Sequence, residues 1–235
     1  MYISILMNQI DNIQTEQETC IQVDTSLPHI MLDMLRITTL VYEYGNKIVV
    51  DDNNMNIEEF VSKMKDSGEL DKIDINDNLK NMMVEISNCV PTGKIYKFIS
   101  DPDTDVQVCI TTCDCKKRVC IVFRGSESKT DWYYDLLITK YNLTDEIRVH
   151  KGFHTQLNSN KIYDELLTDI QIILKQNPDY EIYVTGHSAG AALSTLFGYL
   201  LSHIIENLVT IVSFASPRVG NYAWKKSFEN TLNLR

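Results

Sequence analysis

One stretch of the chain decides the fold, and it reads Tyr180-Glu-Ile-Tyr-Val-Thr-Gly-His-Ser-Ala-Gly190. Residues 180–185 have the composition of a buried strand, and residues 189–205 contain no Asp, Glu, Lys or Arg, as in a buried helix. Between them, the pentapeptide 186–190 has the composition of a sharp turn. Strand, turn and helix in this order are the context in which a G-x-S-x-G motif presents its serine as a nucleophile.

Ser188 is therefore the candidate catalytic residue, since the bend holds its hydroxyl clear of the backbone at the end of the strand. His187 completes the bend, and Gly186 and Gly190 leave room for the strand and helix to approach closely. The start of the helix points free N–H groups and a partial positive charge at a forming oxyanion, so the Ala189 N–H is one expected donor. The alternative is an ordinary Gly/Ser turn, because a five-residue pattern also occurs by chance.

A membrane helix is a second alternative for this stretch. Residues 186–205 carry no Asp, Glu, Lys or Arg and reach the length that a transmembrane helix needs. The segment follows a strand without a break and opens on a sharp turn, which favours a buried helix. We therefore expect no transmembrane span.

Strands and helices alternate in the second half of the chain. Strands are expected at 94–99, 106–113, 118–123, 181–185, 208–215 and 232–235, with a turn at 114–117. Helices are expected at 155–176, 189–205 and 221–230. This order predicts an α/β fold with a mainly parallel central sheet flanked by helices.

The first part of the chain is less regular. We expect an arm at residues 1–27, a helix over 28–47, a short helix capped by Asn56 that runs to Lys65, and helical structure from Asn78 to Cys89. Two units follow: an N-terminal arm and helical region of unknown function at 1–85, and a core at 86–235.

Composition bounds the class of protein. With 44% apolar and 23% charged residues, the 235-residue chain is a packed protein rather than a disordered or multi-span one. A net charge of −10 repels phosphate backbones and argues against nucleic-acid binding. With no signal peptide visible, the cytoplasm is the default location, where the six cysteines stay reduced. Cys113-Asp114-Cys115 lacks the spacing of a zinc knuckle, so we expect packed thiols and no metal.

Five segments appear in order and at sensible spacing: 119–126 (Val-Cys-Ile-Val-Phe-Arg-Gly-Ser), 130–136 (Thr-Asp-Trp-Tyr-Tyr-Asp-Leu), 149–153 (Val-His-Lys-Gly-Phe), the bend at Ser188, and 214–221 (Phe-Ala-Ser-Pro-Arg-Val-Gly-Asn). Over about residues 90–235 the chain resembles the class 3 (fungal-type) lipases of the α/β-hydrolase superfamily. The resemblance implies a serine hydrolase that cleaves ester bonds of acylglycerols or related lipids, at a lipid–water interface, through an acyl-enzyme on Ser188. It implies no cofactor.

The resemblance also assigns roles outside the bend. Ser126 would give the second oxyanion donor through its backbone N–H. Residues 130–138 would form a lid over the site, although a helix packed in the core has the same composition. The candidate lid residues are Trp132, Tyr133, Leu136 and Leu137. Oligomeric state, acyl length and positional preference are left open.

A triad in this fold runs serine, acid, histidine, and the residues after Ser188 lack a clear pair. They hold no Asp, only Glu206 and Glu229, and their one histidine, His203, lies about 21 Å along the helix. The remaining histidines are His29, His150, His154 and His187, and none has the order or position of a base. We therefore expect a C-terminally shortened lipase, inactive by itself. The alternative is a pseudoenzyme that binds lipid or another protein.

Overall fold

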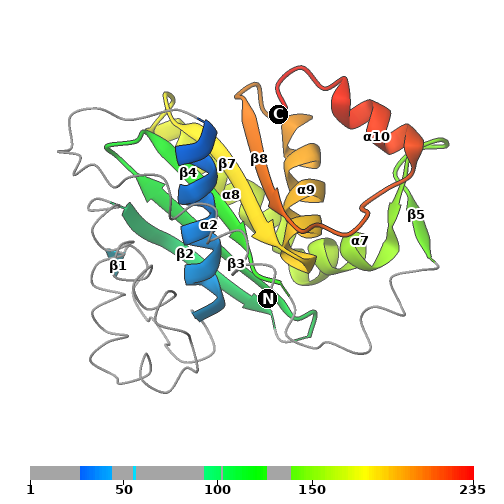
Figure 1. The fold of residues 1–235 in the computed structure, drawn as a ribbon, viewed down its shortest axis with the longest axis horizontal. Coiled ribbons are helices and arrows are strands. Elements are labelled where there is room, and N and C mark those ends of the chain that lie inside the picture. The colour runs from blue at the N-terminus through cyan, green and yellow to red at the C-terminus, as the bar shows by residue number, and fades with distance from the viewer. Residues whose placement is uncertain (1–26, 44–54, 57–92, 102, 126–138) are drawn as a thin grey trace.

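The computed structural model describes residues 27–43, 55–56, 93–101, 103–125 and 139–235 (Figure 1). Its main feature is a six-stranded sheet in the order β1-β2-β3-β4-β7-β8. The strands are β1 (Met55–Asn56), β2 (Gly93–Asp101), β3 (Val106–Cys113), β4 (Arg118–Phe123), β7 (Glu181–His187) and β8 (Val209–Phe214). A small second sheet pairs β5 (Lys140–Asn142) with β6 (Arg148–His150).

The sheet is mixed, which corrects the expectation of a mainly parallel one. Strands β1 to β4 pair antiparallel, whereas β4, β7 and β8 pair parallel. Short connections explain the antiparallel pairing of β2, β3 and β4, because a turn such as 114–117 only lets the chain fold straight back on itself. The three parallel strands are joined by helical crossovers, as the alternating pattern predicted.

Helices cover both faces of the sheet, as Figure 1 shows. They are α2 (Leu27–Glu43), α7 (Lys151–Asn158), α8 (Ile162–Gln176), α9 (Ala189–Ser202) and α10 (Tyr222–Glu229), with a 3₁₀ turn, η1 (Ser159–Lys161). Helix α9 packs on β4, β7 and β8 from one side, and α2 packs on the same three strands from the other. The parallel strands are thus buried on both faces, and every residue of β4 is buried.

The helix predicted over 155–176 is wrong in one respect, because the chain forms two helices there. Asn160 and Lys161 have φ of 49° and 62°, left-handed values that end α7 and begin α8. Asn160 tolerates this region, and its side-chain amide donates to Asp101 Oδ2 at 2.8 Å. A contact with a residue far away in sequence therefore fixes the break, and helical periodicity cannot show it.

The remaining elements agree with the sequence patterns within a few residues. The helix expected at 28–47 is α2, which ends at Glu43. Asn56 lies in β1, and the helices expected at 57–65 and 78–89 fall outside the described residues. The arm expected at 1–27 also lies outside them except for Leu27, which is the first residue of α2. The last predicted strand pairs with β8 through a parallel bridge between Val209 and Leu234. Among the described helices, none has the length and hydropathy needed to cross a bilayer.

Candidate active site

Ser188 stands at the bend between β7 and α9, where the motif places a nucleophile. Its backbone has φ 54° and ψ −121°, a region that costs a non-glycine residue of the order of 1–3 kcal/mol. The backbone around it holds this strain in place. The Ser188 N–H donates to Phe214 O at 3.0 Å, and the Ser188 carbonyl accepts from the N–H groups of Ala191 and Ala192. Within the described residues the Ser188 hydroxyl has no hydrogen-bond partner.

Gly186 and Gly190 are required by close backbone approach. A Cβ built on Gly186 would lie 2.5 Å from Gly190 C and O and 2.7 Å from Phe123 O. A Cβ on Gly190 would lie 2.3 Å from Phe123 O and 2.7 Å from Arg124 C. Such distances are far inside van der Waals contact, so only glycine fits either position. The two glycines therefore let the end of β4, the end of β7 and the start of α9 meet.

The start of α9 supplies candidate oxyanion donors. The first N–H groups of a helix have no partner within the helix, and their dipoles favour negative charge. Ala191 N–H is the first in α9 to bond back to Ser188, which leaves the N–H groups of Ala189 and Gly190 ahead of it. Ala189 is buried at 3% exposure and follows the nucleophile directly. The oxyanion role of its N–H stays a prediction.

The end of β4 lies next to the bend. Phe123 pairs with Gly186 in the parallel ladder, and Arg124 N–H donates to Gln107 O at 2.9 Å. Ser126 follows within three residues but falls outside the described residues, so its oxyanion role stays a prediction. The same holds for the lid candidates Trp132, Tyr133, Leu136 and Leu137.

Thr185 fixes the strand beneath the bend, and the sequence patterns did not single it out. Its side chain is fully buried, and its hydroxyl donates to Val212 O on β8 at 2.7 Å. It also lies 3.2 Å from the hydroxyl of Thr38 on α2. In the sequence, the only indication of this role is a threonine at the end of a mainly apolar strand. These contacts hold β7, β8 and α2 together just before the nucleophile.

Three of the five histidines have local structural roles. His150 Nδ1 accepts from the N–H groups of Gly152 and Phe153 and caps α7. The His154 ring stacks on Tyr141 with centroids 3.6 Å apart. His203 Nδ1 contacts Tyr199 O at 2.7 Å at the far end of α9. The cap at His150 was missed from the sequence, although a polar residue just before a helix is a capping signal.

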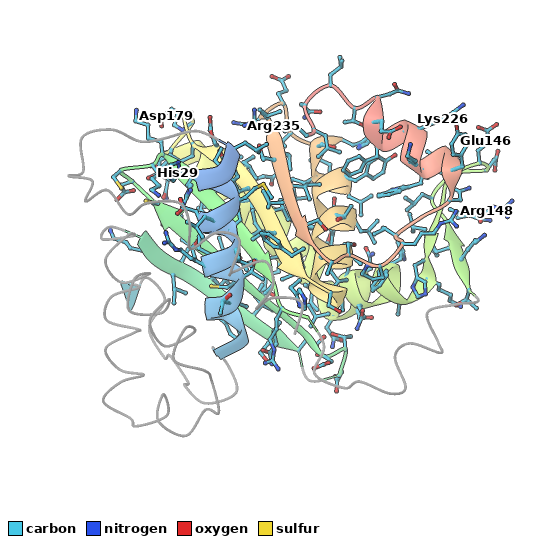
Figure 2. The ribbon with its side chains drawn as sticks, viewed as in Figure 1. His29, Glu146, Arg148, Asp179, Lys226 and Arg235 are labelled. Atoms are coloured by element: carbon cyan, nitrogen blue, oxygen red, sulfur yellow. The ribbon has the colours of Figure 1, made fainter. Side chains whose placement is uncertain are left out.

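The other two histidines differ in position. His187 precedes Ser188, and its burial lowers the pKa of the imidazole. His29, labelled in Figure 2, lies one turn before Asp33, which pairs with Arg118 at the start of β4, so His29 is at the opposite end of the sheet from Ser188. No histidine of the described residues is hydrogen-bonded to Ser188.

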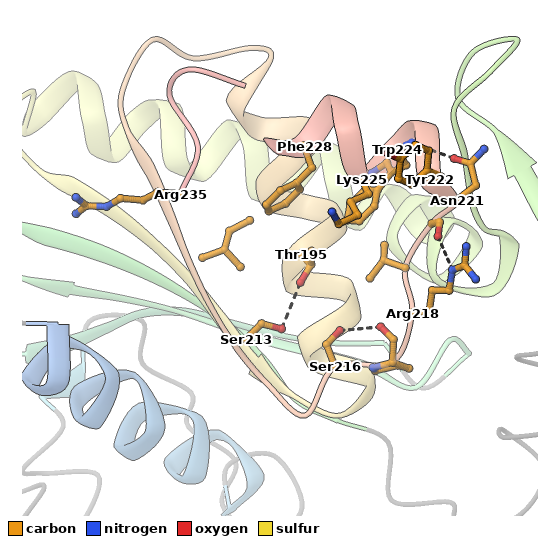
Figure 3. Close-up of a pocket in the computed structure, with 14 residues that line it drawn as sticks. Thr195, Ser213, Ser216, Arg218, Asn221, Tyr222, Trp224, Lys225, Phe228 and Arg235 are labelled. Carbon is orange, nitrogen blue, oxygen red and sulfur yellow. Dashed lines mark hydrogen bonds between the residues drawn. The ribbon is translucent and has the colours of Figure 1, made fainter. Parts of the chain in front are cut away.

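A mainly apolar cavity of about 540 Å³ lies beside β8, between α9 and α10 (Figure 3). Thr195 and Ser213 meet on its floor, with hydroxyl oxygens 3.4 Å apart. Residues 233–235 pair with the first half of β8, and the cavity borders the second half. Ser188 does not line it, so the cavity is next to the candidate site and not part of it.

The second half of the chain is similar to a known protein family. The family model of the class 3 lipases matches residues 120–235. Residues 120–235 belong to the class 3 lipase family. This matched region begins within β4 and includes the bend at Ser188 and the elements that follow it, and the family recognised from the motifs is confirmed.

Two fungal relatives are similar over the same part of the chain. Secreted mono- and diacylglycerol lipase A of Penicillium cyclopium is 32% identical over 133 residues, which are 56% of this chain and 43% of that lipase. A lipase of Rhizomucor miehei is 35% identical over 138 residues, which are 56% of this chain and 37% of that lipase. The chain thus spans less than half the length of these relatives.

Solved structures agree on the architecture. A mutant of MDLA from Penicillium cyclopium gives a TM-score of 0.68 at 24% identity, over 91% of this chain and 71% of that one. Mono- and diacylglycerol lipase from Aspergillus oryzae gives 0.67 at 20% identity, over 89% and 70%. The class 3 lipase core therefore has the α/β-hydrolase fold of fungal lipases, with the mixed sheet described above.

Proposed function

We propose that this chain provides the nucleophile and oxyanion donors of a lipase that hydrolyses carboxylic esters of acylglycerols or related lipids. The Ser188 hydroxyl attacks the ester carbonyl, and an acyl-enzyme forms and is then hydrolysed. The Ala189 N–H faces the oxyanion, together with the Ser126 N–H. The observation that carries the proposal is the strained Ser188 backbone, held at the start of α9 by two glycines that no larger residue replaces.

The lipid substrate rests on the relatives. One is named a mono- and diacylglycerol lipase, and another fungal lipase, with a TM-score of 0.56, was solved with an inhibitor as a model for interfacial activation. By analogy we propose action at a lipid–water interface, with residues 130–138 as the lid. An amphipathic segment suits this role, since it covers the cleft when closed and contacts acyl chains when open.

The esterase activity of residues 1–235 by themselves depends on whether a histidine can act as the base for Ser188. His150 and His203 are engaged in helix ends, and His154 is stacked on Tyr141. We therefore propose that residues 1–235 turn esters over negligibly without an added base. Loss of the triad histidine in subtilisin costs roughly 10⁶ in turnover and leaves about 10³–10⁴ over water from the remaining groups.

Added imidazole tests the nucleophile directly. The full chain is treated with a fluorophosphonate probe at increasing imidazole concentration, and the modified residue is identified by peptide mass mapping. We expect slow labelling of Ser188 that rises with imidazole, because the free base takes the hydroxyl proton that no nearby histidine accepts. Ser188→Ala should abolish the imidazole-dependent labelling.

Ser216→Ala is the matched control, since Ser216 is an exposed serine that bonds only to Pro217 O among the described residues. Its labelling should equal that of the parent chain. If the probe labels Ser188 no faster than Ser216 at any imidazole concentration, the bend does not activate its serine. The second function then holds: a lipase-fold module that binds lipid or protein without chemistry. Rapid turnover of a p-nitrophenyl ester without imidazole would instead refute the proposed need for an added base.

A further inference from the structure

The turn between β3 and β4 brings two thiols into contact. Cys113 is the last residue of β3, Cys115 lies in the turn at 114–117, and their sulfur atoms are 3.4 Å apart. The distance is a contact between thiols and not a bond. Residues two apart also have Cα atoms within about 7 Å of each other. Little backbone movement is therefore needed to reach the range that disulfides occupy.

The two thiols differ in access. Cys115 is exposed, whereas Cys113 is buried at 4% exposure. An accessible thiol in contact with a second, shielded thiol is the arrangement in which one sulfur reacts first and the other resolves the product. Cys109 and Cys120 on the same hairpin are fully buried, and burial raises the pKa of both thiols. Those two cysteines are thus unreactive internal references.

Arg118 places positive charge at this pair. It stands directly opposite Cys113 in the β3–β4 ladder, and its Nη1 pairs with Asp33 Oδ2 on α2. The Arg118 side chain is only 6% exposed, and its Nε and Nη2 have no hydrogen-bond partner among the described residues. A cationic side chain beside a cysteine is one of the surroundings in which reactive cysteines are found.

We propose that Cys113 and Cys115 form a redox-active dithiol that small-molecule disulfides, such as glutathione disulfide, oxidise to an intra-turn disulfide. The Cys115 thiolate attacks one sulfur of the reagent, forms a mixed disulfide and releases one thiolate. The Cys113 thiolate then attacks the Cys115 sulfur and releases the second thiolate. In total, two protein thiols and one reagent disulfide give one protein disulfide and two reagent thiols.

The turn links this chemistry to the rest of the fold. Lys116 Nζ, one residue after Cys115, lies 2.6 Å from Asp33 Oδ2 on α2, and Arg118 Nη1 lies 2.9 Å from the same oxygen. Asp114, between the two cysteines, accepts a hydrogen bond from the hydroxyl of Tyr180, just before β7. A disulfide between Cys113 and Cys115 would change the backbone of the turn next to Lys116 and Arg118, which pair with Asp33 on α2. Oxidation should therefore weaken the contact between the β3–β4 hairpin and α2.

The test uses the full chain with Cys20→Ser and Cys89→Ser, equilibrated with mixtures of reduced and oxidised glutathione. Intact mass and peptide mapping follow the products. We expect loss of two hydrogens, a disulfide between residues 113 and 115, and no lasting adduct. Cys113→Ser should instead accumulate one glutathione on Cys115, because the resolving thiol is gone.

The internal references control for exposure alone. In the folded protein, Cys115 should react with a thiol reagent at least about tenfold faster than Cys109 and Cys120. Hydrogen exchange in α2 should rise on oxidation of the parent and stay unchanged in Cys115→Ser. A lasting glutathione adduct on Cys115 with Cys113 present, or a disulfide that joins other cysteines, overturns the proposal. If Cys113→Ser does not fold, the mapping of the parent chain decides alone.

Discussion

Gly190→Ala is the sharpest test of the geometry at the bend. The new methyl group would lie 2.3 Å from Phe123 O, about 1 Å inside ordinary contact. The clashing atoms belong to backbone that the β4–β7 ladder holds in place, so they cannot rotate away. Overpacking of this kind costs up to about 3 kcal/mol. Alanine recovers up to about 1 kcal/mol of helix propensity, so the free energy of unfolding should fall by about 2 kcal/mol.

Gly198→Ala is the matched control on the same helix. Its methyl group would meet Ile211 Cδ1 at 2.6 Å and Ile211 Cγ1 at 2.8 Å, which are side-chain atoms rather than backbone, and Ile211 borders the cavity beside β8 into which it can shift. The overpacking cost should then be smaller than at Gly190, so the gain in helix propensity offsets more of it. Urea unfolding followed by circular dichroism measures both variants. A change below about 0.5 kcal/mol for Gly190→Ala, or a larger loss for Gly198→Ala, would refute the argument.

Two further predictions concern the contacts that support the bend and α2. Thr185→Val keeps the shape of the side chain but leaves Val212 O without its donor, and it should lower the free energy of unfolding by about 1–2 kcal/mol in the same assay. Burial raises the pKa of Asp33, but Arg118 and Lys116 together hold it below its ordinary value of 3.8. Asp33→Asn should cost about 3–5 kcal/mol at neutral pH. Because the folded pKa is the lower one, that difference should persist down to about pH 4 and shrink below it; an unchanged difference at pH 2 would contradict the ion pair.

The bend at Ser188 between β7 and α9 was predictable because its signals are local. A strand, a Gly/Ser pentapeptide and an uncharged helix follow one another within about 25 residues, and each element depends on its own composition. The structure adds why both glycines are needed, since Phe123 and Arg124 approach them from a strand far away in sequence. That approach leaves no periodic signal.

Other features depended on contacts that no local pattern carries. The break at Asn160 is fixed by Asp101, and the position of α2 by Asp33 and Thr38 against residues of β4 and β7. The antiparallel half of the sheet follows from short turns that the sequence did show. Ser126 and the lid candidates lie outside the described residues and stay predictions.

The pairing of β4 with β7 has a consequence for how the protein is made. The two strands are about 60 residues apart in sequence, and their contact must close before Phe123 and Arg124 can press on Gly190. During synthesis β4 leaves the ribosome long before α9, so the growing chain cannot yet form the bend at Ser188. The strained backbone of Ser188 depends on this long-range ladder, so the bend that the proposed nucleophile needs forms only late, once the core has assembled.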